Sequence, residues 1–343
     1  MKESTVTVGN LLPEDDYMHP VSADPSHNES MFFNFWDTRE RVGGFVRIGN
    51  RPNEGHAEVT LCLFLPGGEV LMQWRRPAID SNDAFNAAGM TMRVLEPGRR
   101  LQVGFAGEAV RIANPDEMRD PGKALRGNPK CQVQLDLEIT GSGPMIGDRE
   151  GSPGSVIFLA GGGHYQQPIR ARGRLAVDAE QWPIDGFGVR DHSWGPRIWH
   201  SIYRDRSLWI SFGPELSIIA CKTWLSATGG ADEMGCIVEN GKVTPLRSIV
   251  MSSHFRPGTY YHDAVNLEIV DTEGRSLALK GKVLTYVPLR HRKEGQETVY
   301  LGQAMTSFTL GSRQVIGLSE YFDAASATAD LIAVSERGDY VSE

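Results

Sequence analysis

The chain has 343 residues, of which 40% are hydrophobic and 23% are charged, a composition typical of globular proteins and a length that favours two domains. Its net charge of −8, without clusters of Lys and Arg, argues against nucleic acid as a partner. The sequence contains no run of about 18 apolar residues that would predict a membrane span, and its polar N-terminus lacks a signal segment, so we expect a cytoplasmic protein.

Short segments in which apolar and polar residues alternate recur along most of the chain. Four of them surround a Gly-containing turn and each predicts a hairpin of two strands: 56–74, 90–105, 234–246 and 265–283. Helical periodicity is weak and is best at 81–88 and 324–336. We therefore predict an all-β fold of two tandem antiparallel barrels or sandwiches with few short helices.

The boundary between the two halves is expected between residues 178 and 188. This gives an N-terminal β domain, 1–182, and a C-terminal β domain, 183–343. The most unusual stretch of the chain, IDGFGVRDHSWGPRIWH at 184–200, then lies at the domain junction, where ligand sites often form.

Motif searches exclude several kinds of chemistry. The chain has no phosphate-binding loop, no nucleophile elbow, no zinc-protease motif and no complete dinucleotide fingerprint. Its nine His are not spaced as a ligand set on one element, although the strands of a barrel can collect ligands from a distance. We expect no cofactor and no metal.

The segment from Gly186 to Arg197, GFGVRDHSWGPR, follows the tetrapeptide HYQQ at 164–167 by about 20 residues. Together they resemble the superfamily of AttH-like proteins and carotenoid 1,2-hydratases, also called hydroxyneurosporene synthases, in its poorly characterised bacterial branch. NESMFFNFWD at 28–37 and GLSEYFD at 317–323 extend the resemblance over most of the chain. The hydratase pattern Asp-His-Asn-x-Gly is matched at Asp191 and His192, but Ser193 replaces the Asn.

The resemblance implies two tandem lipocalin-like domains and a bulky hydrophobic substrate held in a cavity. Enzymes of the superfamily include carotenoid hydratases, a fungal isoflavonoid hydratase and relatives that guide cyclisation. Protonation of a C=C bond needs an acid that keeps its proton near neutral pH, and apolar surroundings raise the pKa of a carboxyl. We expect Asp191 to be that acid, with His192 as its orienting group or as a base, and His164 and Tyr165 as further catalytic groups.

Aromatic and polar residues of the same two segments are the expected substrate-binding groups: Trp194, Trp199, Phe187, Arg197 and Gln167. In the alternative interpretation, Asp191 is an ionised acceptor of the following turn, paired with Arg190 or Arg197.

Other residues of the chain have two interpretations each. The polar group at 47–56 is expected to be a solvated hairpin end, whereas Glu320 is a candidate second acid or base if it faces inward. Four other Trp are expected in the core: Trp36, Trp74, Trp209 and Trp224.

The expected function is a cofactor-independent acid–base enzyme, a hydratase or dehydratase, isomerase or cyclase, for a hydrophobic terpenoid-, steroid- or polyketide-like small molecule. The alternative is a lipocalin-like carrier that binds such a molecule without changing it. A mainly apolar cavity that includes residues 191–199 or 164–167 is expected in either case. The sequence leaves the oligomeric state open.

The variant Asp191→Asn separates the two interpretations of Asp191. If Asp191 donates a proton to carbon, turnover falls by about 10²-fold or more while ligand affinity survives. If Asp191 is an ionised acceptor, the variant instead lowers stability by about 1 to 3 kcal/mol. Turnover, ligand affinity and melting temperature measured on one preparation decide between them.

Overall fold

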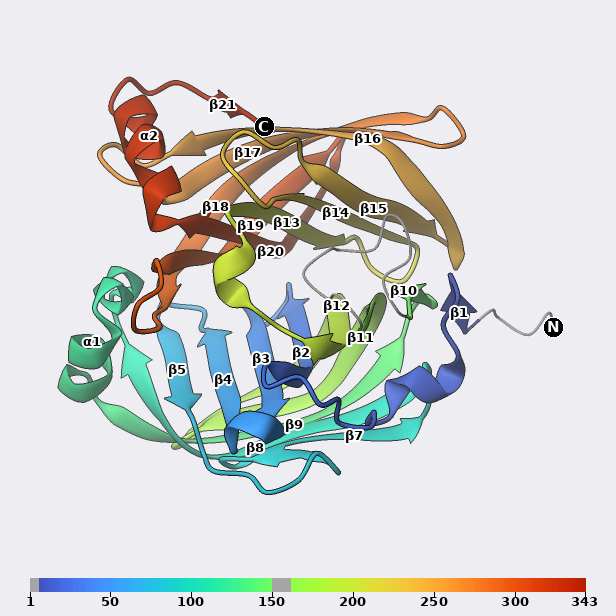
Figure 1. Cartoon of the computed structure of the whole chain (residues 1–343), viewed down its shortest axis with the longest axis vertical. Helices are drawn as coiled ribbons and strands as arrows, with labels where there is room; N and C mark the ends of the chain where they lie inside the picture. Colours follow the sequence, from blue (N-terminus) through green and yellow to red (C-terminus); the bar gives the residue numbers. More distant parts are fainter. Residues whose placement is uncertain (1–5, 150–161) are drawn as a thin grey trace.

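The computed structural model describes residues 6–149 and 162–343 and contains two β-sheets, one above the other in Figure 1, whose strands are antiparallel except for the parallel pair of β1 and β10. The strands of the first sheet are β1 (Thr7–Val8), β2 (His27–Asp37), β3 (Val42–Arg51), β4 (His56–Phe64), β5 (Val70–Arg75), β6 (Phe85–Ala87), β7 (Met90–Glu96), β8 (Arg100–Ile112), β9 (Lys130–Gly141), β10 (Met145–Asp148), β11 (Gly163–Val177) and β12 (Glu180–Pro196). Those of the second sheet are β13 (Arg204–Ser211), β14 (Leu216–Trp224), β15 (Asp232–Glu239), β16 (Lys242–Phe255), β17 (His262–Asp271), β18 (Ser276–His291), β19 (Val299–Leu310), β20 (Arg313–Ala324) and β21 (Val341–Ser342).

Each sheet closes on itself. In the first sheet the pairings run from β11 through β12, β2, β3, β4, β5, β8 and β9 and return to β11. In the second sheet they run from β13 through β14, β15, β16, β17, β18, β19 and β20 and return to β13. Closure leaves few free edges, and it confirms the predicted all-β architecture of two barrels.

The four predicted hairpins are confirmed as the pairs β4–β5, β7–β8, β15–β16 and β17–β18. Their turns contain Gly68, Gly98, Gly241 and Gly274, with φ of 86°, 66°, 79° and 87°, a backbone conformation that side chains with a Cβ rarely adopt.

The helices are short: η1 (Pro13–Asp16), η2 (Pro52–Glu54), η3 (Pro115–Arg119), α1 (Pro121–Gly127), η4 (Trp199–Ser201) and α2 (Ala325–Ser335). The helix predicted at 324–336 is confirmed as α2, whereas the one predicted at 81–88 is wrong. There Phe85 and Ala87 are buried on either side of the exposed Asn86, which is the period of a strand, β6. Within the part of the chain that the structure describes, no helix has the length and apolar character needed to span a bilayer.

The change from one sheet to the other comes later in the chain than the expected boundary at 182. Strand β12 pairs along its length with β11 and with β2, so the segment expected to open the second domain completes the first barrel. The sequence gives no sign of this because β12 pairs with a strand that lies about 160 residues away in the chain. We infer that the N-terminal unit extends to Pro196 and that residues 197–203, with η4, link the barrels.

Burial differs between strands according to what covers their outer face. Side chains of β9 alternate between exposed and buried over most of its length, since its outer face meets solvent. All side chains of β2 are buried, because Phe33 and Phe35 fill the first barrel while Phe32 and Trp36 pack toward the second barrel. The outer faces of the two barrels therefore form a shared interface.

A buried ion pair fixes the N-terminal segment to the first barrel. Arg190 of β12 donates two hydrogen bonds to Asp16 of η1, of 2.7 and 2.9 Å, and both side chains are fully buried. Asp16 also accepts from the hydroxyl of Tyr165 and from the backbone amide of Gly98 in the β7–β8 turn. The network joins three segments that are distant in the sequence.

Loss of Arg190 would leave the Asp16 carboxylate buried without its cation. We expect Arg190→Met to lower the free energy of unfolding by about 3 to 5 kcal/mol, measured by urea denaturation. The matched control is Arg170→Met, which removes a partly exposed pair with Asp185 and should cost about 1 kcal/mol or less. Equal effects of the two variants would show that the buried pair has no special role.

Candidate functional site

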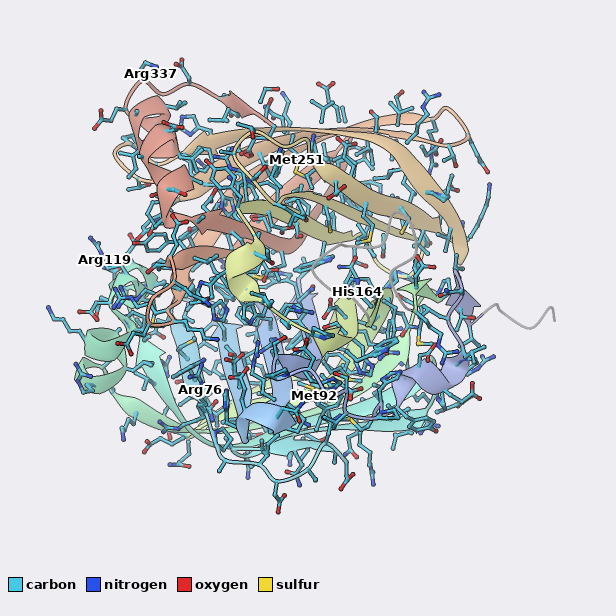
Figure 2. The ribbon with its side chains drawn as sticks, viewed as in Figure 1. Arg76, Met92, Arg119, His164, Met251 and Arg337 are labelled. Carbon is cyan, nitrogen blue, oxygen red and sulfur yellow. The ribbon has the colours of Figure 1, made fainter. Side chains whose placement is uncertain are left out.

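A cavity of about 380 Å³ lies between the two barrels. The first barrel contributes side chains from the outer faces of β2 to β5 and from β11 and β12, and the second barrel contributes them from β13, β14, β15, β18, β19 and β20. Trp199 of the linker also lines it. Aromatic and aliphatic side chains make up much of the wall, as expected, but many charged groups interrupt it, including His164 at the level where the barrels meet (Figure 2).

Alternation along β11 and β12 decides which predicted residues reach the cavity. His164 and Asp191 line it, as do Arg197 and Trp199 just beyond β12. Five other predicted site residues do not line it: Tyr165, Gln167, Phe187, His192 and Trp194. Successive side chains of a strand point to opposite faces, so the motif is divided between two environments.

The cavity-facing pair consists of His164 and Asp191, whose Nε2 and Oδ2 atoms lie 2.5 Å apart. Burial opposes ionisation of Asp191, but His164, Arg197 and Arg47 together outweigh burial and hold the pKa of Asp191 below its usual value. This corrects the expectation of a raised pKa. Asp191 is an ionised acceptor, and its partner is His164 rather than the following turn.

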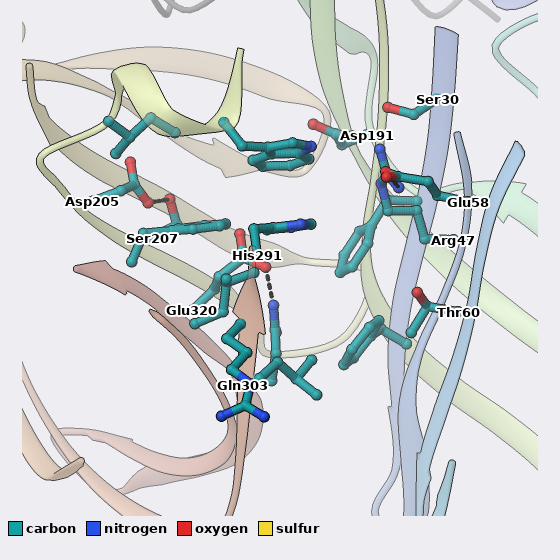
Figure 3. Close-up of a pocket in the computed structure, with 18 of the residues that line it drawn as sticks. Ser30, Arg47, Glu58, Thr60, Asp191, Asp205, Ser207, His291, Gln303 and Glu320 are labelled. Carbon is teal, nitrogen blue, oxygen red and sulfur yellow. Dashed lines mark hydrogen bonds and ion pairs between the residues drawn. The ribbon is translucent and has the colours of Figure 1, made fainter. Parts of the chain in front are cut away.

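On the opposite wall of the cavity lies Glu320, a carboxyl whose pKa is raised rather than lowered. Burial, together with the charges of Asp205 and Asp191, raises the pKa of Glu320 from 4.5 to about 8, against the hydrogen bond that Glu320 accepts from Gln303. Figure 3 shows Glu320 and Gln303 on the β19–β20 side of the cavity and Asp191 on the other side. Glu320 therefore keeps its proton at neutral pH.

A second carboxyl on that wall, Asp205 of β13, is also affected by burial. Burial raises its pKa to about 6, although hydrogen bonds from Thr223 and Ser207 favour its ionised form. Both hydroxyls hold the carboxylate in place on the cavity wall, and Figure 3 shows Ser207 beside Asp205.

The polar group near residue 50 is not a solvated hairpin end. Arg47 and Arg51 are largely buried, and both approach Glu58, at 3.6 and 3.8 Å. Arg47 and Glu58 line the cavity. The sequence shows these charges but not that the outer face of β3 and β4 is covered by a second barrel.

Trp199 is the centre of an aromatic stack in the cavity wall. Its ring lies 4.6 Å from the ring of His291 and 5.8 Å from that of Phe322, both nearly parallel to it. Burial lowers the pKa of His291 to about 4, so this imidazole is neutral. Two further Trp expected in the core, Trp74 and Trp209, also line the cavity.

The predicted residues that do not line the cavity have structural contacts. Tyr165 and Gln167, on the other face of β11, both bind Arg190, which extends the buried network around Asp16. Phe187 is on the same face of β12 as Asp191 but outside the cavity, beneath the guanidinium of Arg170.

The remaining two, His192 and Trp194, belong to a buried group around Glu29. Trp194 stacks on His19 with ring centroids 3.8 Å apart, and His192 Nε2 lies 3.0 Å from Glu29 Oε1. Within residues 6–149 and 162–343, His19, Glu29 and His192 also place three possible metal ligands within 4.8 Å of one another. The Glu29 carboxylate serves as hydrogen-bond acceptor for both imidazoles, so these three residues satisfy one another without an ion.

A family model described as "Domain of unknown function (DUF7064)" matches residues 12–325 of this chain. A search of curated proteins finds no match.

Three solved structures have the same fold at low sequence identity. An AttH-type protein from Nitrosomonas europaea is 12% identical with a TM-score of 0.58, covering 88% of this chain and 93% of its own. Kievitone hydratase from Nectria haematococca is 13% identical with a TM-score of 0.57, covering 94% and 97%. CghA with Sch210972 is 10% identical with a TM-score of 0.52, covering 90% and 96%. The fold that the resemblance to AttH-like and hydratase proteins implied is confirmed.

The neutral state of Glu320 has a measurable effect on stability. Its pKa is raised on folding from 4.5 to about 8, so the stability it contributes is fully present below 4.5 and is lost as pH rises through about 8. The Gln side chain of the variant Glu320→Gln cannot ionise, so the variant does not lose this stability as pH rises. We expect the stability of the natural chain relative to Glu320→Gln to fall between about pH 5 and about pH 9, by at most about 1.4 kcal/mol per pH unit.

Urea denaturation at several pH values measures this difference. The control is Glu138→Gln, which removes a carboxyl that is 55% exposed and should give no such trend. A difference between the natural chain and Glu320→Gln that is constant with pH would mean that Glu320 ionises normally in the folded chain.

Proposed function

The chain belongs to the DUF7064 family, and we propose that it is an acid–base enzyme of the hydratase, isomerase or cyclase type that acts on a hydrophobic small molecule between its two barrels. One observation carries this proposal. A buried carboxyl, Glu320, and a His–carboxylate pair, His164 and Asp191, line the same cavity from different barrels.

Glu320 is suited to the role of general acid. A carboxyl that keeps its proton at neutral pH can deliver it to carbon or oxygen of a bound molecule, and an acid whose pKa is near the working pH is the most effective. Gln303 fixes one oxygen of the carboxyl, because its amide donates a hydrogen bond to Glu320 Oε2. The other oxygen remains for the substrate.

His164 is suited to the role of base. The ionised Asp191 can only accept hydrogen bonds, so His164 Nε2 donates to it, and a neutral imidazole then has its lone pair on Nδ1. The carboxylate also stabilises the imidazolium that forms when His164 takes a proton. We therefore propose that Asp191 positions His164, in place of the acid role that the sequence predicts.

The two roles combine into a balanced reaction. Glu320 protonates one end of a C=C bond, and His164 takes a proton either from a water that adds to the other end or from a neighbouring carbon. When the proton comes from water, the reaction is a hydration. When it comes from a neighbouring carbon, the double bond moves or, with ring closure, a cyclic product forms. Aromatic faces in the wall, above all Trp199, favour a substrate that develops positive charge at carbon.

Two similar structures support this class of function. One of them is by name a hydratase, kievitone hydratase, and another, CghA, was crystallised with the small molecule Sch210972. A hydrophobic terpenoid-, steroid- or polyketide-like substrate fits the aromatic wall of the cavity.

The proposal is tested with three unsaturated ketones: β-ionone, progesterone and xanthohumol. Each is incubated with the protein in D₂O, and mass spectrometry detects deuterium at carbon or an added water. For any compound that is turned over, Glu320→Gln and His164→Asn should each lower the rate by about 10²-fold or more, whereas the surface variant Glu138→Gln should leave it unchanged.

The same incubations separate an enzyme from a carrier. Compounds that bind in the cavity and emerge without deuterium or water indicate a carrier. A rate that is unchanged in Glu320→Gln contradicts the assignment of the acid.

A further inference from the structure

The cavity contains more positive than negative charge at one end. Arg47 and Arg197 both line it, and they are close enough that the charge of Arg47 lowers the pKa of Arg197. Burial and Arg47 bring the pKa of Arg197 down to about 10, so both guanidinium groups remain charged at neutral pH. Two buried like charges are unfavourable unless anions compensate them.

The carboxylates nearby are already shared among several cations. Glu58 approaches Arg47, Arg51 and Arg76, at 3.6, 3.8 and 3.0 Å. Asp191 is shared between His164, Arg197 and Arg47.

Glu320, which also faces the two guanidinium groups, is neutral at this pH and adds no negative charge. Among the described residues that line this end of the cavity, the cations Arg47, Arg76 and Arg197 therefore outnumber the ionised carboxylates Glu58 and Asp191.

Both guanidinium groups are held in place by local structure. Gly49, two residues after Arg47 on β3, leaves room for the Arg47 guanidinium, because a Cβ at Gly49 would come within 2.6 to 2.9 Å of it. Arg197 donates to the hydroxyl of Ser193 at 2.5 Å, so the residue that departs from the hydratase pattern orients a cation at the cavity. Positioning by neighbours is typical of groups that bind a ligand.

Hydrogen-bond donors are also left over in this region. Arg47 Nη2 and Trp199 Nε1 are buried and have no hydrogen-bond partner among the described residues. The Trp199 ring lies 5.5 Å from the Arg47 guanidinium carbon and 4.9 Å from that of Arg197. Buried donors without acceptors are costly, and an oxygen-rich ligand would satisfy them.

We infer that the cavity takes an organic acid: a planar hydrophobic molecule whose carboxylate, or acidic enol or phenol oxygen, binds Arg47 and Arg197 beside Trp199. The aromatic stack of Trp199, His291 and Phe322 supplies the flat apolar wall, and the guanidinium groups supply the anion site. This inference names the substrate class of the proposed enzyme and rests on that proposal only for its biological meaning, because binding can be measured without turnover.

The test compares two fluorescent probes with the same rings. 8-Anilinonaphthalene-1-sulfonate carries an anion, and N-phenyl-1-naphthylamine is its neutral counterpart. We expect the sulfonate to bind at least about tenfold more tightly. Arg47→Met and Arg197→Met should each weaken the sulfonate by about tenfold or more while leaving the neutral probe nearly unchanged.

Two further variants keep the result interpretable. Gly49→Ala displaces the Arg47 guanidinium without changing the charge, and it should weaken only the sulfonate. Arg93→Met removes an exposed guanidinium far from the cavity lining and should change neither affinity.

Equal affinities of the two probes for the natural chain, or sulfonate binding that survives in Arg47→Met, Arg197→Met and Gly49→Ala, overturn the inference. Turnover of neutral ketones that depends on Glu320 would still support the proposed enzyme. Sulfonate binding without any turnover would support the anion site and contradict the enzyme.

Discussion

The alternation of side chains along the paired strands β11 and β12 is the constraint on which the rest of the structure depends. These two strands pair from Gly163 to Val177, so residues opposite each other share a face. One face builds the buried network around Asp16 and Arg190, which ties the N-terminal segment to the barrel. The other face brings His164 and Asp191 to the cavity. A single strand pair thus provides both a structural anchor and a site.

The cavity exists because the outer faces of both barrels are covered. Aromatic and aliphatic side chains of β2 to β5 pack toward those of β13, β14 and β19, and Trp199 of the linker lines the gap between them. Burial opposes the ionisation of both Asp191 and Glu320, and their neighbours decide the outcome. The cations around Asp191 overcome burial, whereas for Glu320 burial and the charges of Asp205 and Asp191 outweigh Arg47 and the hydrogen bond from Gln303. An acid and a His–carboxylate pair can therefore coexist in one cavity.

Burial also strengthens the electrostatic effect of the guanidinium groups at the positive end of the cavity. A guanidinium group on the surface is solvated, but Arg47 and Arg197 are enclosed between two barrels, where water does not screen them. Gly49 and Ser193 help to position them, together with the carboxylates of Glu58 near Arg47 and of Asp191 near Arg197. In the proposed enzyme, Glu320 and His164 form the region for reaction, and Arg47 and Arg197 form the region for recognition.

The sequence by itself determined the class of fold, the position of four hairpins and the segments from which the site is built. Hairpins are local, since Gly at a turn and alternation beside it act over about ten residues, and so they can be predicted. Only the tertiary structure decided which residues of those segments meet. His164, Asp191 and Glu320 were identifiable as candidates, but the sequence did not show that Glu320 and Arg47 join the first two from strands more than a hundred residues away in the chain. Tyr165, His192 and Trp194 share the same motif and face the other way. Alternation assigns neighbours to opposite faces, and only the packing of the barrels determines which face becomes the cavity.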